Sequence, residues 1–280
     1  MSISSFIPTV WSETLYQALG KKYIGVAHCN RDYEGDIREC GDTVKICGLN
    51  PISVHDYTKN TDMSAPDELS GFASDLVIDQ AKYFNFLIDD IDRAQSNPDA
   101  MQLAMKNAAS ALSDAADKYV YKICSETGLV FEAAVNADTI LNALIEARTR
   151  LLEHNVTEGE EVFLEVSPYI AEMLFKAKIN FATDNSYMLE NGCLGSILGC
   201  KVYVTKNIVV EGTDTGETHC CVMRTKRAVT FAEQLSEIDA YRPELRFADA
   251  VKGLHLYGAK VVYPEEMLRV KLSVITKPGV

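Results

Sequence analysis

The sequence predicts an α+β protein, and three patterns support this fold class. A helical signal runs over residues 97–127, whereas residues 42–49 and 75–86 alternate between apolar and polar side chains. Residues 129–180 then predict strand, helix, strand and helix in turn. Because the two periodicities occupy separate stretches and no internal repeat is visible, the sheets are expected to be mixed.

Composition is typical of a globular protein with a strongly acidic surface. Of the 280 residues, 47% are hydrophobic and 24% are charged, which is enough to bury a sizeable core. The 27 basic and 40 acidic residues give a net charge of −13. This charge repels phosphate backbones, so tight nucleic-acid binding is not expected. The short basic groups are interpreted as solvated surface: Lys21 with Lys22, and Arg224 with Lys226 and Arg227.

Neither a secretion signal nor a membrane segment is expected. The N-terminal stretch has no basic region followed by an apolar one, and no apolar run reaches the roughly 18 residues that cross a bilayer. The eight cysteines are therefore expected to be reduced and to pack as small apolar groups. His28 and His55 lie near the first three cysteines and leave a zinc site open, although no C-x₂-C pair is present.

The first 90 residues predict an arm followed by a hairpin. Ser12 can cap a short helix over Glu13–Leu19, and Tyr23–Ala27 is expected to be a strand. Two alternating segments, 42–49 and 75–86, flank the polar stretch Tyr57–Ser70 and predict a β-hairpin with a long loop. Because an isolated two-stranded hairpin is marginal in water, we expect it to find support on another subunit.

The helix predicted over 97–127 is the strongest single element. Asn97 is a good N-cap, Pro98 suits the first turn, and Gly128 follows the end. At 1.5 Å per residue it would be a rod of about 40 Å. Its apolar face is expected to consist of Met101, Met105, Ala108, Leu112, Ala115, Tyr119 and Ile123.

Further elements follow in order along the chain. Asp138 is expected to cap a helix that ends near Glu153, and Pro168 to open another over Tyr169–Ala177. Strands are expected at Val162–Val166, Lys201–Thr205 and Cys220–Met223, with a turn at Gly212–Gly216 and two strands in 254–275 around Pro264.

Sequence motifs for catalysis are weak. The stretch Gly253–Lys260 resembles a phosphate loop but has Ala259 where the lysine belongs. The carboxylates Asp79, Asp89, Asp90 and Asp92 leave a two-metal site open, but a turn before the long helix is favoured. Five scattered histidines leave a spatial catalytic triad open without supporting one. We expect no catalytic residue, cofactor or metal.

Five stretches in order resemble the Hong Kong 97-type capsid proteins of tailed phages, in the branch related to the Salmonella short-tailed phages. They are Phe6–Glu13, Leu76–Gln95, Val166–Ile170, Gly192–Thr205 and Tyr257–Glu265. The resemblance spans almost the whole chain. It implies an N-arm at 1–30, an extended loop at 31–90, a peripheral domain at 91–135 with its spine helix at 97–127, an axial domain at 136–240 and a return to the peripheral domain at 241–280.

The same resemblance implies a structural role. The chain would self-assemble into pentamers and hexamers of an icosahedral shell around phage double-stranded DNA, without sequence-specific binding, and would be found in the virion capsid after assembly in the host cytoplasm. A separate scaffolding protein and a portal are the expected partners, and a decoration protein is left open. An encapsulin-like or gene-transfer-agent shell, and more remotely a cytosolic enzyme, remain alternatives.

Contacts between copies are expected from the arm, the loop tip, the acidic turn and the long helix. Lys59 and Asn60 also raise the idea of a covalent cross-link at the tip, although a solvated tip is favoured. The candidate residues are Trp11, Lys59, Asn60, Asp62, Pro66, Glu68, Asp89, Asp90 and Arg93.

Overall fold

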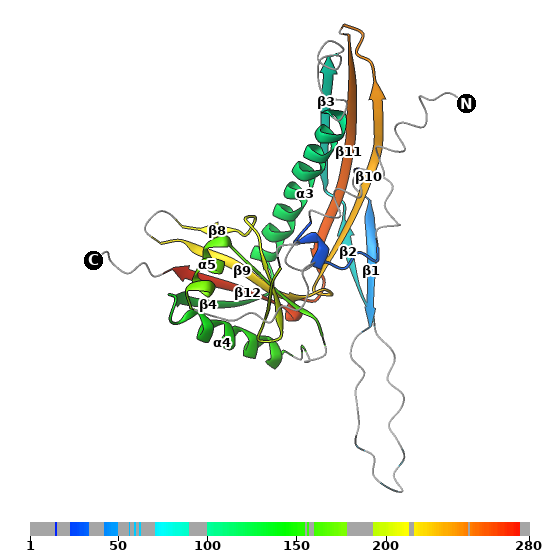
Figure 1. Cartoon of the computed structure of the whole chain (residues 1–280). Helices are drawn as coiled ribbons and strands as arrows, with labels where there is room; N and C mark the ends of the chain where they lie inside the picture. The colour runs from blue at the N-terminus through cyan, green and yellow to red at the C-terminus, as the bar shows by residue number, and fades with distance from the viewer. Residues whose placement is uncertain are drawn as a thin grey trace.

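In the computed structural model, most of the chain folds into two parts. Figure 1 shows a compact unit and a tall blade of three long strands, with the longest helix running along the blade. The residues described are 15, 23–33, 42–49, 56, 59, 62, 71–89, 100–154, 156, 160–177, 193–212, 216–245 and 247–274. The α+β fold class predicted from the sequence is confirmed.

A mixed seven-stranded sheet forms the compact unit. Its order is β4 (Leu129–Val135), β12 (Met267–Val274), β9 (Thr218–Thr225), β5 (Val162–Val166), β7 (Cys200–Val204) and β6 (Cys193–Ile197), with β8 (Val210–Glu211) paired to β9. The helices α4 (Ile140–Glu153) and α5 (Pro168–Lys176) pack against this sheet in one hydrophobic core. The predicted strand–helix–strand–helix order of residues 129–180 is therefore confirmed.

The central strands of this sheet are buried on both faces. Every residue of β5 is buried, and so is all of β9 except its first residue. Val162, Leu164 and Val166 join the core that contains α4 and α5, so Phe163 and Glu165 point to the opposite face. A buried carboxylate on that face must be paired by another part of the chain.

The blade is a three-stranded antiparallel sheet with a helix on one side. Its strands are β10 (Val229–Tyr241), β11 (Ala248–Val261) and β3 (Gln80–Asp89), in that order. The helix α3 (Ala100–Glu126) lies against the blade in a second core with Phe84, Phe231, Val251 and Tyr257. A 3₁₀ turn, η4 (Pro264–Glu266), separates β11 from β12, and the break predicted at Pro264 is confirmed.

The predicted hairpin is present as a two-stranded ribbon beside the base of the blade (Figure 1). Its strands are β1 (Thr43–Leu49) and β2 (Gly71–Val77), paired from Thr43 opposite Val77 to Leu49 opposite Gly71. The predicted return strand over 75–86 was wrong in its extent, because β2 and β3 are separate strands of different sheets. The chain changes sheets at Ile78 and Asp79, and the amide of Ile78 donates to the carbonyl of Asp42 (3.0 Å).

The predicted length of α3 is confirmed, but the face predicted to be buried was wrong. Among the stripe residues whose burial the structure describes, which leaves out Met101, only Met105 and Leu112 are buried. The other buried apolar positions are Ala109, Ala116, Val120, Tyr121 and Cys124. Alanines lie on both sides of the predicted stripe, so the sequence did not show which of two adjacent faces of the helix is buried. This face packs within its own subunit, and the expected role of the helix in contacts between copies remains a prediction.

Two local predictions were also wrong, and two strands were missed. Tyr23–Ala27 is not a strand, because the chain turns there into the 3₁₀ helix η2 (Val26–His28). Asp138 does not cap α4: the side-chain Oδ1 of Asn136 accepts the amides of Asp138 and Thr139 (2.9 and 3.0 Å). The sequence reading missed β10 and β6, and charged residues interrupt the apolar alternation of β10. The predicted N-cap Asn97 and the first-turn Pro98 of α3 lie outside the described residues.

Glycine 258 allows the base of the blade to touch the ribbon. A Cβ atom at Gly258 would lie 2.3 Å from the carbonyl oxygen of Val77, a backbone atom that cannot move alone. We therefore expect Gly258→Ala to lower the free energy of unfolding by about 2 kcal/mol or more. Gly216→Ala is the matched control, because nothing lies within 4 Å of its added Cβ. Equal urea midpoints for the two variants would contradict this packing.

Candidate assembly surfaces and the junction behind them

Only some of the predicted contact residues lie in the described chain. Lys59 and Asp62 are exposed, and the backbone of Asp89 ends β3 opposite Ala248. Trp11, Asn60, Pro66, Glu68, Asp90 and Arg93 lie outside the described residues, as does most of the polar stretch Tyr57–Ser70. The proposed role of all nine residues remains a prediction.

The ribbon is buried on one face and open on the other. Val44, Ile46, Leu76 and Ile78 form a small core with Ala232 and Leu256 of the blade. On the open face Thr43, Lys45, Asp75 and Val77 are exposed, and Val77 retains 49% of its surface. The blade thus supports one face of this two-stranded ribbon, and a further covering surface would bury the other face.

The face of the blade away from α3 carries exposed apolar side chains. Tyr83 is 78% exposed, and Leu87, Tyr241 and Leu254 are partly exposed. Leu254 lies directly opposite Tyr83 across the β11–β3 ladder. At the far end, Leu245 and Phe247 between β10 and β11 are 97% and 82% exposed. Grouped large apolar side chains of this kind mark surfaces that contact other proteins.

A buried ion pair lies at the junction of the compact unit and the N-terminal segment. Arg224 on β9 and Glu165 on β5 are both 0% exposed and form two hydrogen bonds, Nε to Oε2 at 3.1 Å and Nη2 to Oε1 at 3.0 Å. The remaining donors of Arg224 reach the carbonyls of Gly25 (2.7 Å) and His28 (3.1 Å) and the sulfur of Cys29 (3.2 Å). All five N–H groups of the guanidinium are thereby used.

His28 completes this contact from the N-terminal side. Its Nδ1 lies 2.8 Å from Oε1 of Glu165. Its ring stacks on Phe163, with centroids 4.2 Å apart, and touches Tyr203 at the same distance. Phe163, Glu165 and Tyr203 come from neighbouring strands of one sheet. The N-terminal segment therefore covers the face of the sheet opposite α4 and α5.

Two further buried carboxylates hold the same segment against the blade. Asp117 of α3 accepts the amides of Ile24 and Val26 (3.0 and 2.9 Å). Glu233 of β10 accepts the hydroxyl of Tyr23 and pairs with Arg31, and Nε2 of His255 lies 2.8 Å away. We call Asp117, Glu165 and Glu233 the carboxylate junction, because together they connect the segment Tyr23–Arg31 to α3, β5 and β10.

Burial and pairing act in opposite directions on these acids. Burial raises the pKa of Glu165 and Glu233, but the charge of Arg224 on the first, and the hydrogen bond and charge of His255 on the second, hold the pKa of both below the ordinary value. Among the described residues, Asp117 has only backbone amides as direct partners, and burial raises its pKa to about 6. Glu165 and Glu233 therefore stabilise the fold as anions. Ionisation of Asp117, by contrast, lowers the stability of the fold, because its charge is buried.

Comparison of the whole chain with known proteins identifies its fold. No protein-family model and no curated protein sequence matches the chain. A solved structure of Mycobacterium phage Che8 matches with a TM-score of 0.68 and 28% identity, over 89% of this chain and 90% of that one. The capsid of Ralstonia phage GP4 matches with a TM-score of 0.66 and 12% identity, over 93% and 91%.

The chain has the Hong Kong 97-type fold of capsid proteins. The same fold is found in a virus-like particle from Pyrococcus furiosus, with a TM-score of 0.56 and 12% identity over 92% of this chain and 96% of that one. The resemblance drawn from the five sequence stretches is confirmed at the level of this capsid fold.

The described residues also bear on the metal and catalytic features that the sequence left open: Ser167 Oγ lies 3.0 Å from Nδ1 of His219, whose Nε2 lies 3.7 Å from Oε2 of Glu217. No group of three or more His, Cys, Asp or Glu side chains in the described ranges could hold a metal ion. The phosphate-loop candidate Gly253–Lys260 is part of β11. Six cysteines of the described chain are buried and free: Cys29, Cys124, Cys193, Cys200, Cys220 and Cys221. No described helix is both long and apolar enough to cross a membrane. His55, Asp90 and Asp92 lie outside the described residues.

Sequence reasoning missed the carboxylate junction. Arg224 was assigned to a solvated basic group, and this was wrong because the side chain is fully buried. A signal was present: Glu165 is the one charged residue in Val162–Val166, and Glu233 follows Val229–Ala232, in which Thr230 is the one polar residue. A single charge inside an apolar strand requires a buried partner. The sequence did not indicate which partner.

The buried ion pair generates the first prediction for this junction. Glu165→Gln leaves Arg224 without its anion, and we expect the free energy of unfolding to fall by about 3–5 kcal/mol. Glu211→Gln is the matched control, because Glu211 pairs with Lys271 at 3.0 Å with 49% of its side chain exposed, and an exposed pair contributes about 1 kcal/mol or less. Urea unfolding of unassembled subunits measures both, and equal losses would contradict the role given to Glu165.

A second prediction concerns pH. Because the pKa of Asp117 is raised from 3.8 to about 6, the folded chain binds more protons than the unfolded chain between those values. Stability therefore falls as the pH rises through this window, by on the order of 2 kcal/mol from this group. We expect Asp117→Asn to remove this fall when urea midpoints at pH 4.5 and 7.5 are compared. An unchanged pH dependence in the variant would contradict the assignment.

Proposed function

We propose that this chain is the major capsid protein of a tailed bacteriophage, a structural subunit without catalytic activity. Copies would assemble into pentamers and hexamers of an icosahedral shell that encloses double-stranded DNA. The observation that carries the proposal is the match of a capsid fold over about nine tenths of the chain. The ribbon with one open face and the blade with exposed Tyr83, Leu245 and Phe247 support it, because they offer surfaces for neighbouring copies.

The domain assignment follows as part of this proposal. The segment 1–30 would be the N-arm and 31–90 the extended loop, with the blade as peripheral domain and the seven-stranded unit as axial domain. The strand β3 pairs within the blade, whereas β4 and β12 pair within the seven-stranded sheet.

Charge supports the proposed role as a container. With a net charge of −13, the shell would confine DNA without binding it in a sequence-specific way. We propose a separate scaffolding protein and a portal as partners, with a decoration protein left open, and assembly in the host cytoplasm before the subunit becomes part of the virion capsid.

An encapsulin-like compartment is the second candidate. The match to the virus-like particle from Pyrococcus furiosus favours it, since that comparison covers 96% of the other chain. The contents of purified particles distinguish the two functions. DNA together with a portal would support the phage shell, whereas an enzyme cargo without DNA would support the compartment.

Electron microscopy of the expressed protein, alone and with its neighbouring gene products, tests the proposal. We expect pentamers, hexamers or closed shells. Val77→Lys, on the open face of the ribbon, should reduce shell formation because it places a charge where a neighbour would lie. The same variant should change the subunit's free energy of unfolding by less than about 0.5 kcal/mol. Dispersed monomers of the wild-type chain under every assembly condition would contradict the proposed function.

A further inference from the structure

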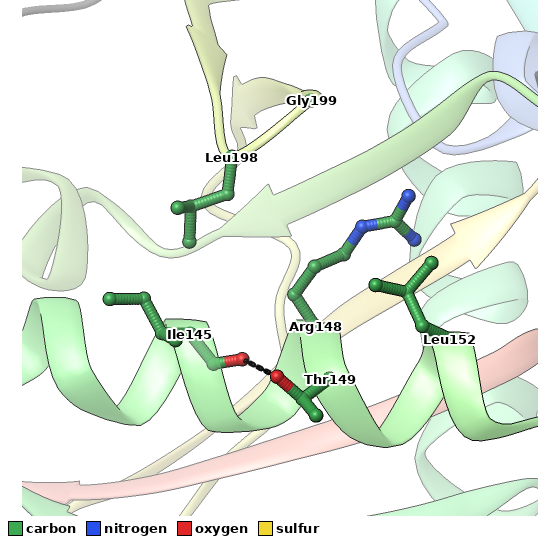
Figure 2. Close-up of a pocket in the computed structure, with 6 residues that line it drawn as sticks. All are labelled: Ile145, Arg148, Thr149, Leu152, Leu198 and Gly199. Atoms are coloured by element: carbon green, nitrogen blue, oxygen red, sulfur yellow. Dashed lines mark hydrogen bonds between the residues drawn. The ribbon is translucent and has the colours of Figure 1, made fainter. Parts of the chain in front are cut away.

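An open pocket lies on the compact unit, away from the ribbon and the blade. It has a volume of about 460 Å³ and is lined by Ile145, Arg148, Thr149, Leu152, Leu198 and Gly199. Figure 2 shows Ile145, Thr149 and Leu152 on α4 along one side, Leu198 facing them, and the side chain of Arg148 rising from α4 toward the strands. The hydroxyl of Thr149 donates to the carbonyl of Ile145 (2.9 Å) and is therefore already used.

Arg148 is the unusual member of this pocket. It is only 8% exposed, and its buried Nη1 has no hydrogen-bond partner. Arg224, which is buried more deeply, has an acceptor for every donor. Nothing in the described part of the chain supplies an acceptor to this nitrogen of Arg148. Because an unpaired buried cation is costly, an anion from outside the chain would be strongly favoured there.

The opposite wall of the pocket is held in a strained conformation. Leu198 has a φ of 52° and Gly199 a φ of 74°, which makes the turn between β6 and β7 left-handed at two successive residues. Such turns favour asparagine or glycine, and leucine at positive φ is disfavoured. The turn leaves Leu198 41% exposed opposite α4. A large apolar side chain at this strained position provides a contact surface for a ligand.

The lining defines the chemistry of the ligand. Ile145, Leu152 and Leu198 are 42%, 38% and 41% exposed, so the rim is apolar around a single cation. A carboxylate beside apolar side chains fits this arrangement. Nucleic acid does not fit, because a phosphate backbone would approach a protein of net charge −13. A second copy of this chain supplies carboxylates in excess, with 40 acidic residues.

We propose that the Arg148 pocket receives an acidic side chain, with its apolar neighbours, from a second copy of this chain. The resulting ion pair forms only on assembly. The inference rests on the proposed function as a shell subunit and adds to it a specific contact on the compact unit. It places one intersubunit contact at α4 and the β6–β7 turn, separate from the ribbon, the blade and the nine residues predicted from the sequence.

Replacing the arginine tests this inference. Arg148→Met keeps the volume and removes the charge, and Arg148→Glu reverses it. We expect Arg148→Met to lower the assembled fraction by about tenfold, as for one lost charge-assisted hydrogen bond, and Arg148→Glu by more. The urea midpoint of the unassembled subunit should not fall for Arg148→Met, because no partner is lost within the subunit. Arg150→Met, the same change two residues along α4, is the matched control and should assemble like the wild type.

Hydrogen exchange gives the direct readout. Peptides covering residues 145–152 and 197–200 should exchange more slowly in assembled particles than in free subunits, with or without DNA inside. Wild-type assembly with equal assembly of both Arg148 variants would overturn the inference and leave the proposed function standing, whereas failure of the wild type to assemble would overturn the function itself. A lowered subunit midpoint for Arg148→Met, or protection that needs DNA, would also overturn the inference.

Discussion

The ion pair between Arg224 and Glu165 is the contact on which the rest of the subunit depends. Both groups are fully buried, and the guanidinium is satisfied only when Gly25, His28 and Cys29 lie over the sheet. Two central strands and the N-terminal segment are therefore fixed together. Asp117 and Glu233 extend this connection to α3 and β10. The compact unit and the blade share one set of buried charges.

Some parts of the subunit find all their partners within the same chain, whereas other surfaces are left uncovered. At the junction every acid has its partners, and the chain provides them from segments far apart in sequence. The ribbon, the outer face of the blade and the Arg148 pocket instead have exposed apolar groups or an unpaired cation. A shell of identical copies resolves this difference, because each copy can cover the surfaces that its neighbour leaves open.

Local patterns in the sequence determined much of the fold. The periodicity of Ala100–Glu126, the proline at position 168 and the glycine at position 128 predicted three element boundaries within a few residues. The junction was not predictable in the same way, because Arg224 and Glu165 are 59 residues apart in the chain. Their pairing depends on which strands become neighbours. The same limit applies to β10, whose Glu233 resembles a surface residue until Tyr23, Arg31 and His255 surround it.

The face of α3 illustrates another limit. Alanines at positions 108, 109, 115 and 116 make two stripes equally apolar, and the choice between them follows from the segment that Asp117 binds. Arg148 was unremarkable in the sequence, since arginines on helices normally reach solvent. Its burial becomes visible only when the β6–β7 turn is placed opposite α4.

Hydrogen exchange of free subunits and of assembled particles tests the central claim most directly. The claim is that the carboxylate junction holds the N-terminal segment in place within one subunit, whereas the open face of the ribbon is covered only by neighbouring subunits. Peptides covering Tyr23–Arg31 should be strongly protected in both states, and peptides covering Thr43–Leu49 only after assembly. Rapid exchange of Tyr23–Arg31 in the free subunit, or equal protection of Thr43–Leu49 in both states, would contradict it.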